Sequence, residues 1–221
     1  MPSRIQAKFI SQQPQKHGYW LIKVELSNFI DLNIGSRLAW QGNQAWLFQK
    51  QHTELRLLAT QDWGLEPQEL VVLEYRHFDL DWSAKSDQLW LGSDLSQAAV
   101  FDAAKRWQQA PHPKGRFSAL LHASEAFAFQ PHPARFMLDL SPQAIGASPL
   151  LEDYGIANRL ASDQGLPGCH DGSLAELYQA WLLQKDSTQW QVFGFLPKSI
   201  HQACFELSKP HQNLDFQVRA Y

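Results

Sequence analysis

The chain is poor in cysteine, with only Cys169 and Cys204 among its 221 residues. Two thiols cannot form a framework of several disulfides, and they are too few to hold an iron–sulfur cluster. Low cysteine content without a disulfide pattern is typical of proteins from reducing compartments. We therefore expect a reduced, cytoplasmic protein.

Long apolar runs and an excess of positive charge are also missing. No run approaches the roughly 18 apolar residues of a membrane-spanning helix, and the N-terminus has no apolar leader segment. The chain has 19 Lys and Arg against 22 Asp and Glu, a net charge of −3. This balance gives no basic surface for nucleic acid. We expect neither a membrane nor a nucleic acid as partner.

Aromatic residues, by contrast, are plentiful, with nine tryptophans and thirteen phenylalanines. Such a composition indicates compact packing rather than disorder. It also leaves open a contact between copies of the chain, because tryptophan is common at interfaces. A homo-oligomer is therefore possible.

The first part of the chain has the alternating pattern and turn residues of short strands. The expected strands are residues 4–10, 19–26, 37–40, 44–48, 55–60 and 69–75. Gly42-Asn43 separates two of them and predicts a tight hairpin. This spacing predicts a small antiparallel β-barrel.

Farther along the chain, strands alternate with helices. The expected strands are 88–91, 116–122, 190–195 and 214–218, and the expected helices are 95–108, 174–183 and 199–207. Such alternation predicts right-handed crossovers and a mostly parallel sheet. We therefore predict an α/β protein of two domains. An N-terminal antiparallel β-barrel at residues 1–84 precedes a Rossmann-like parallel sheet with flanking helices at residues 85–221.

Three glycines, Gly165, Gly168 and Gly172, precede an expected helix start at Ser173. Glycine permits positive φ and close approach of the backbone to a neighbour. A glycine-rich turn before a helix presents unpaired N–H groups that can hold an anion. The same pattern also suits a tight connection that binds nothing.

Four segments together resemble the ferredoxin–NADP reductase superfamily, most closely the electron-transfer subunit of dihydroorotate dehydrogenase. They are residues 127–136, 149–162, 165–172 and 190–200. The resemblance implies a flavin-binding barrel ahead of an NAD(P)-binding domain. It also implies that the three glycines line a dinucleotide site, with Gly92 and Gly194 as further remnants of that site.

The expected nucleotide motifs are altered in this chain. After the first strand of the nucleotide domain the family has a glycine-rich loop, whereas Gly92 here is followed by Ser93, Asp94, Leu95 and Ser96. We predict that Asp94 caps the following helix and repels phosphate. Family members also border the nicotinamide with small residues. Bulky residues, Phe195 and Leu196, stand at those positions, and we expect Phe195 to be packed in the core.

The flavin motif of the family, an arginine followed by an aromatic and a hydroxyl residue, is absent around Arg4, Arg37, Arg56 and Arg76. The cysteine-rich segment of the electron-transfer subunits also has no counterpart. We therefore expect a degenerate reductase-like protein without intrinsic flavin or iron–sulfur chemistry. It would bind an unknown protein partner or a small ligand in the interdomain cleft. The alternative is an NAD(P)H-linked oxidoreductase or electron-transfer subunit whose FAD or other flavin is weakly bound or supplied by a partner.

Two other groupings of reactive residues are weaker. Cys169, His170 and Asp171 have the residue types of a nucleophile, base and orienting acid, but consecutive residues cannot face one another as a triad requires. His122 and Glu125, together with that segment, have no tight spacing of metal ligands. Loop residues are the preferred interpretation of both groups.

A last expectation concerns the adjacent acids Glu152 and Asp153. Neighbouring residues on a helix point about 100° apart, so they cannot act as a matched carboxylate pair. Arg159 follows at a suitable distance, and we predict an ion pair with one of them.

Overall fold

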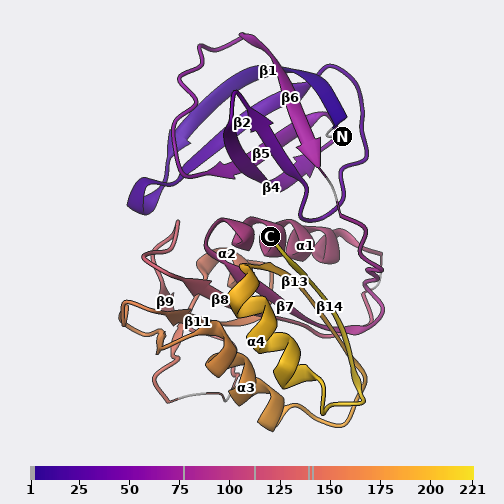
Figure 1. Cartoon of the computed structure of the whole chain (residues 1–221), viewed down its shortest axis with the longest axis vertical. Coiled ribbons are helices and arrows are strands. Elements are labelled where there is room, and N and C mark those ends of the chain that lie inside the picture. The colour runs from indigo at the N-terminus through magenta and orange to yellow at the C-terminus, as the bar shows by residue number, and fades with distance from the viewer. Residues whose placement is uncertain (1–2, 77, 112, 139, 141) are drawn as a thin grey trace.

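The structure, a computed structural model, describes residues 3–221 except for 77, 112, 139 and 141. Figure 1 shows a β-barrel at one end of the molecule and a layered arrangement of sheet and helices at the other. The N-terminal side of the chain forms the barrel, and the C-terminus lies between the two parts. The predicted fold class is confirmed.

The barrel is closed by six antiparallel strands in the order β1-β2-β5-β4-β3-β6. They are β1 (Ser3–Pro14), β2 (Trp20–Leu26), β3 (Arg37–Trp40), β4 (Asn43–Gln51), β5 (Glu54–Ala59) and β6 (Leu70–Arg76). A short 3₁₀ turn, η1 (Lys16–Gly18), joins the first two. Alternate residues point inward and are fully buried, for example Ile22, Leu47 and Leu57, as a half-buried strand requires.

The predicted hairpin connects β3 to β4. Its turn residues are Gln41 and Gly42, with φ of 47° and 85°, and Trp40 pairs with Asn43 across the turn. Positive φ at both central positions is the type I′ geometry that matches strand twist. The turn is therefore one residue earlier than the Gly42-Asn43 pair indicates.

The second part contains a six-stranded parallel sheet in the order β12-β11-β8-β7-β13-β14. Its strands are β7 (Asp87–Ser93), β8 (Phe117–Ala123), β11 (Ala157–Ser162), β12 (His170–Asp171), β13 (Trp190–Leu196) and β14 (Leu214–Ala220). The short strands β9 (His132–Pro133) and β10 (Gly146–Ala147) pair with each other beside it. The predicted boundary at residue 84 falls in the connection from β6 to β7.

Helices cover both faces of the sheet. They are α1 (Gln97–Gln109), which follows the short turn η2 (Asp94–Ser96), α2 (Pro149–Asp153), α3 (Leu174–Gln184) and α4 (Lys198–Ser208). Buried residues of α1 and α2 share one apolar cluster with one sheet face, and those of α3 and α4 share another with the opposite face. Three helices match the prediction, whereas helix α2, strand β11 and the two-residue strands β9, β10 and β12 were not predicted.

Helix α1 is also the main contact between the sheet and the barrel (Figure 1). The ring of Phe101 on α1 lies 5.2 Å from that of Phe48 on β4. On the same helix, Arg106 donates to the buried carboxylate of Asp102 at 3.0 Å and to the Leu32 carbonyl of the barrel at 2.7 Å. Burial raises the pKa of Asp102 to about 6, and the charge of Arg106 opposes that rise.

This raised pKa predicts a pH dependence of stability. The folded-state pKa lies above the usual 3.8, so the native state binds the proton more tightly than the unfolded chain. The carboxyl therefore stabilises the fold at low pH, and this contribution is lost as the pH rises through about 6. We expect the free energy of unfolding of Asp102→Asn, relative to that of the wild type, to be about 2 kcal/mol higher at pH 7.5 than at pH 4.

Urea unfolding of both proteins at the two pH values measures this difference. Asp81→Asn, at an exposed aspartate, is the matched control and should show little change between them. A pH-independent difference for Asp102→Asn would contradict the assignment of a raised pKa.

Candidate functional site

The order of the parallel strands defines where a ligand site is expected. From β7 the chain proceeds to β8 and β11 on one side and to β13 and β14 on the other. Open α/β sheets bind ligands in the crevice outside the carboxyl ends of the strands where this order reverses. In this chain, that switch point lies between the ends of β7 and β13, at Ser93 and Leu196. The side chains around it form the candidate site.

A short turn connects β7 to α1 at this point. The Ser93 N–H donates to Ser96 Oγ at 2.9 Å, and the Ser93 side chain accepts from the Ser96 N–H, which completes a capping box. Asp94 stands between them with φ of 49°, in the left-handed region. The prediction that Asp94 caps the helix is therefore wrong, because the two serine hydroxyls already satisfy the turn.

Asp94 instead connects this turn to the loop that follows β8. Its carboxylate accepts hydrogen bonds from the backbone N–H and the hydroxyl of Ser124, both at 2.9 Å. A negative side chain thus occupies the start of the helix segment, and the Ser124 N–H is no longer available to a ligand.

A chain of polar side chains runs along the carboxyl edge of the sheet below Asp94. Ser93 Oγ lies 2.9 Å from His122 Nδ1, and His122 Nε2 lies 3.0 Å from Asp163 Oδ1. The second contact has ion-pair distance, but His122 Nε2 makes no hydrogen bond within the described residues. Ser93 and His122 are 0 % and 1 % exposed, so both are shielded from solvent. The group joins the ends of β7, β8 and β11.

The reasoning from sequence missed this chain of side chains. Ser93 and His122 lie at the ends of β7 and β8, and Asp163 follows β11, far apart in the sequence. Parallel pairing brings the carboxyl ends of these strands to one edge. A polar residue at or just after the end of each strand could have predicted this grouping. That prediction, however, depends on recognising residues 157–162 as a strand.

An aromatic cluster fills the space between the switch point and the barrel. Phe195 is fully buried, as predicted, and its ring lies directly on the backbone of Gly35, where a Cβ would overlap it. Its ring centroid is 5.4 Å from that of Trp46 and 5.2 Å from that of Phe78. Tyr221 lies against the other side of the cluster, 5.2 Å from Trp46.

Two of the predicted nucleotide-site glycines, Gly92 and Gly194, lie in the interior of the sheet near this cluster. A Cβ on Gly92 would meet Val100 at 2.8 Å, so its absence permits close packing of α1 on β7. Gly194 has φ of +154°, and a Cβ there would overlap the Leu91 carbonyl of the neighbouring strand. Both glycines serve close packing.

The other three glycines lie at the far edge of the sheet. Gly168 accepts a hydrogen bond from the Gly146 N–H at 2.6 Å. Gly165 and Gly172 have φ of +60° and +146°. They belong to the connection around β12, and β11 and β8 separate that strand from β7. The structure thus divides the five glycines into two groups, and their binding of a nucleotide stays a prediction.

Neither of the weaker groupings forms a site in the described part of the chain. Burial raises the pKa of the Cys169 thiol to about 11, which keeps it protonated and unreactive near neutral pH. Among the described residues, no group of three or more His, Cys, Asp or Glu side chains could hold a metal ion.

The predicted ion pair of Arg159 is wrong. Arg135 donates to Glu152 at 2.9 Å and to Asp153 at 2.9 Å. Arg159 donates instead to the carbonyls of Asn158 and Phe136. Because α2 ends at Asp153 and Arg159 lies in β11, closeness in the sequence does not bring Arg159 into an ion pair with either acid.

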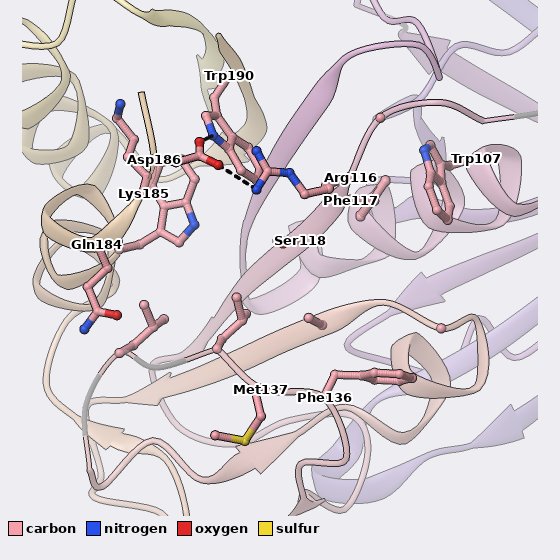
Figure 2. A pocket seen from close by; sticks show the side chains of 16 residues that line it. Trp107, Arg116, Phe117, Ser118, Phe136, Met137, Gln184, Lys185, Asp186 and Trp190 are labelled. Carbon is pink, nitrogen blue, oxygen red and sulfur yellow. Dashed lines mark hydrogen bonds and ion pairs between the residues drawn. The ribbon is translucent and has the colours of Figure 1, made fainter. Parts of the chain in front are cut away.

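A separate pocket of about 610 Å³ lies at the amino edge of the sheet (Figure 2). Aromatic walls surround it, formed by Trp107, Phe117, Phe136, Trp181 and Trp190. The one arginine of its lining is fully engaged: Arg116 pairs with Asp87 at 2.6 Å and Asp186 at 2.8 Å and lies over the Trp190 ring. The pocket suits apolar groups, and the described residues of its lining include no pair of side chains arranged for acid–base chemistry.

Comparison with solved structures identifies the fold. The ferredoxin reductase in carbazole 1,9a-dioxygenase matches with a TM-score of 0.66 at 8% identity, over 98% of this chain and 69% of that one. The chain has the two-domain fold of the ferredoxin–NADP reductases. The H286L mutant of ferredoxin–NADP⁺ reductase from Plasmodium falciparum matches with a TM-score of 0.65 at 8% identity, over 99% and 96% of the chains.

A third solved structure with this reductase-like fold is the flavohemoglobin from Malassezia yamatoensis with bound FAD and heme. It matches with a TM-score of 0.67 at 10% identity, over 97% of this chain and 60% of that one. No protein-family model and no curated protein matches the sequence. In the described residues, none of the helices has the length and apolar character needed to cross a membrane.

The packing at Gly194 gives a testable prediction. Gly194→Ala should destabilise the protein by at least about 2 kcal/mol, because the new Cβ overlaps the backbone of β7 and φ is unfavourable for alanine. Gly18→Ala is the control, since Gly18 has φ of +79° but open space around it; it should cost only about 1 kcal/mol. Urea unfolding measures both variants. Equal losses of unfolding free energy would contradict the prediction that the close approach of β13 to β7 requires glycine at residue 194.

Proposed function

We propose that this reductase-like protein has no flavin or NAD(P)H chemistry of its own and acts by binding a small ligand or a protein partner. The observation that carries the proposal is the position of Phe195, whose buried ring lies between the switch point and the barrel. Ligands of open α/β sheets bind at this crevice, and here a side chain of the protein fills it.

The aromatic cluster does not fit a flavin between the two parts. A flavin requires a flat slot for its three fused rings, but Trp46 is in direct ring contact with both Phe195 and Tyr221. The Tyr221 hydroxyl also donates to the Ser93 carbonyl at 3.3 Å, which holds that ring against the end of β7. Opening a slot would require displacement of Phe195, which has no exposed surface.

The turn after β7 also does not fit a pyrophosphate. Helix starts bind phosphate through free N–H groups and the positive end of the helix dipole. In this turn the Ser93 N–H donates to Ser96 Oγ, and the carboxylate of Asp94 is held in place by Ser124. A fixed negative charge repels a second anion, so this turn disfavours a dinucleotide.

A second candidate is an NAD(P)H-linked oxidoreductase or electron-transfer subunit with a weakly bound or partner-supplied flavin. Its support is the fold, which extends over almost the whole chain in the reductase comparisons. The glycines Gly165, Gly168 and Gly172 would line its dinucleotide site. Fold likeness at such low identity does not by itself assign an activity.

Cofactor content distinguishes the two functions. Protein purified without added cofactor should be colourless, without flavin absorbance, and should not oxidise NADH or NADPH with an artificial acceptor. The same assays with added FMN or FAD test a loosely bound flavin, and we expect rates no higher than for free flavin alone. Yellow protein, or flavin-dependent oxidation of NAD(P)H above that background, would support the oxidoreductase instead.

A further inference from the structure

Two arginines of the barrel stand directly opposite each other without a counter-ion. Arg37 on β3 and Arg76 on β6 are cross-strand partners. Like charges at directly opposite positions destabilise a sheet. Among the described residues no carboxylate lies within ion-pair distance of either guanidinium, although the chain has more acidic than basic side chains. The pair is therefore a local concentration of positive charge.

Arg37 is held in a fixed position by aromatic rings. Its guanidinium carbon lies 5.3 Å from the Trp46 ring centroid, 5.1 Å from that of Phe78 and 6.0 Å from that of Tyr221. Its Nε is buried and has no acceptor within the described part of the chain. Burial, and secondly the charge of Arg76, lower the pKa of Arg37. A buried donor without an acceptor is costly. An anion beside the guanidinium would offset both the loss of solvation of the Arg37 charge and its repulsion with Arg76.

Both arginines line one pocket of about 260 Å³ on the outer face of the barrel, together with Gln44 and Glu74. The Glu74 carboxylate is already bound by Arg4, at 2.8 Å on the neighbouring strand. It therefore offers no free counter-charge to Arg37 or Arg76. The pocket presents two guanidinium groups, one amide and the Glu74 carboxylate, whose charge is offset by its ion pair with Arg4.

We propose that Arg37 and Arg76 bind the phosphoryl group of a small phosphorylated molecule. A phosphoryl dianion matches two positive charges, and its oxygens accept the paired N–H groups of guanidinium. The pocket is smaller than the roughly 300–1,000 Å³ of sites for drug-sized ligands, so it suits a phosphate or a small phosphate ester rather than a dinucleotide. The pocket opens on the outer face of the barrel, beside the aromatic cluster that Arg37 contacts, and the phosphate-binding proposal does not depend on the proposed function.

Inorganic phosphate is the first probe, with sodium chloride at equal ionic strength as the reference. At ten times its Kd, phosphate should raise the Tm of the wild-type protein by roughly 3–6 °C. Calorimetric titration then compares inorganic phosphate with a small phosphate ester, which separates the free ion from an esterified ligand. A stronger response to the ester would identify the ligand as a phosphorylated metabolite.

Arg76→Gln is the decisive variant, because Arg76 is exposed and its loss should not prevent folding. Phosphate affinity should fall about tenfold or more, while the Tm without phosphate should stay equal or rise as the repulsion with Arg37 is relieved. Arg56→Gln makes the same charge change on β5, away from the pocket, and should keep wild-type affinity. Equal phosphate responses of wild type and Arg76→Gln, or no response of wild type, would overturn the proposal.

Discussion

The contact between the Phe195 ring and the bare backbone of Gly35 determines how the two parts of this molecule fit together. Only glycine permits it, since any Cβ at residue 35 would overlap the ring. Phe195 is held from the other side by its own strand, where its carbonyl accepts from Ser96 Oγ at 2.5 Å. The end of β13, the turn before α1 and the barrel therefore meet at one residue, Phe195. Because protein interiors are close-packed, the Phe195 ring leaves no room for another group beside Gly35 in this structure.

The polar groups at the carboxyl edge of the sheet follow the same pattern. Asp94 is bound by Ser124, and Ser93 lies against His122. These side chains satisfy one another in a place where other proteins of this fold type present free backbone groups to a ligand. The barrel face around Arg37 differs from this edge of the sheet, because the positive charges of Arg37 and Arg76 have no carboxylate partner among the described residues. We therefore place the proposed anion site on the barrel rather than at the switch point.

The sequence predicted those parts of the fold that depend on local patterns. Alternation in 37–40 and 44–48 and helical spacing in 95–108 are properties of short segments, and the corresponding strands and helix are present. The strand β11 was missed because it contains polar residues, Asn158 and Arg159, that are buried in the sheet. Without β11, the meeting of Ser93, His122 and Asp163 could not be foreseen.

Other features were not predicted because they depend on pairing between segments far apart in the sequence. Arg37 and Arg76 are opposite each other only because β3 and β6 are neighbours in the closed barrel, and this order is not a property of either segment. Asp94 was assigned to the helix cap because an acid at a helix start usually serves that role, whereas the structure gives the capping box to Ser93 and Ser96. The burial of Phe195 was foreseen from its size, but its contact with Gly35 was not.

A crystal structure of the protein grown with an excess of FAD and NADP⁺ is the most direct test of the filled crevice. It should show the Phe195 ring on Gly35 and the Trp46 and Tyr221 rings in contact, with no cofactor between the barrel and the sheet. A flavin or nicotinamide ring between Trp46 and Tyr221, with Phe195 displaced, would contradict the account.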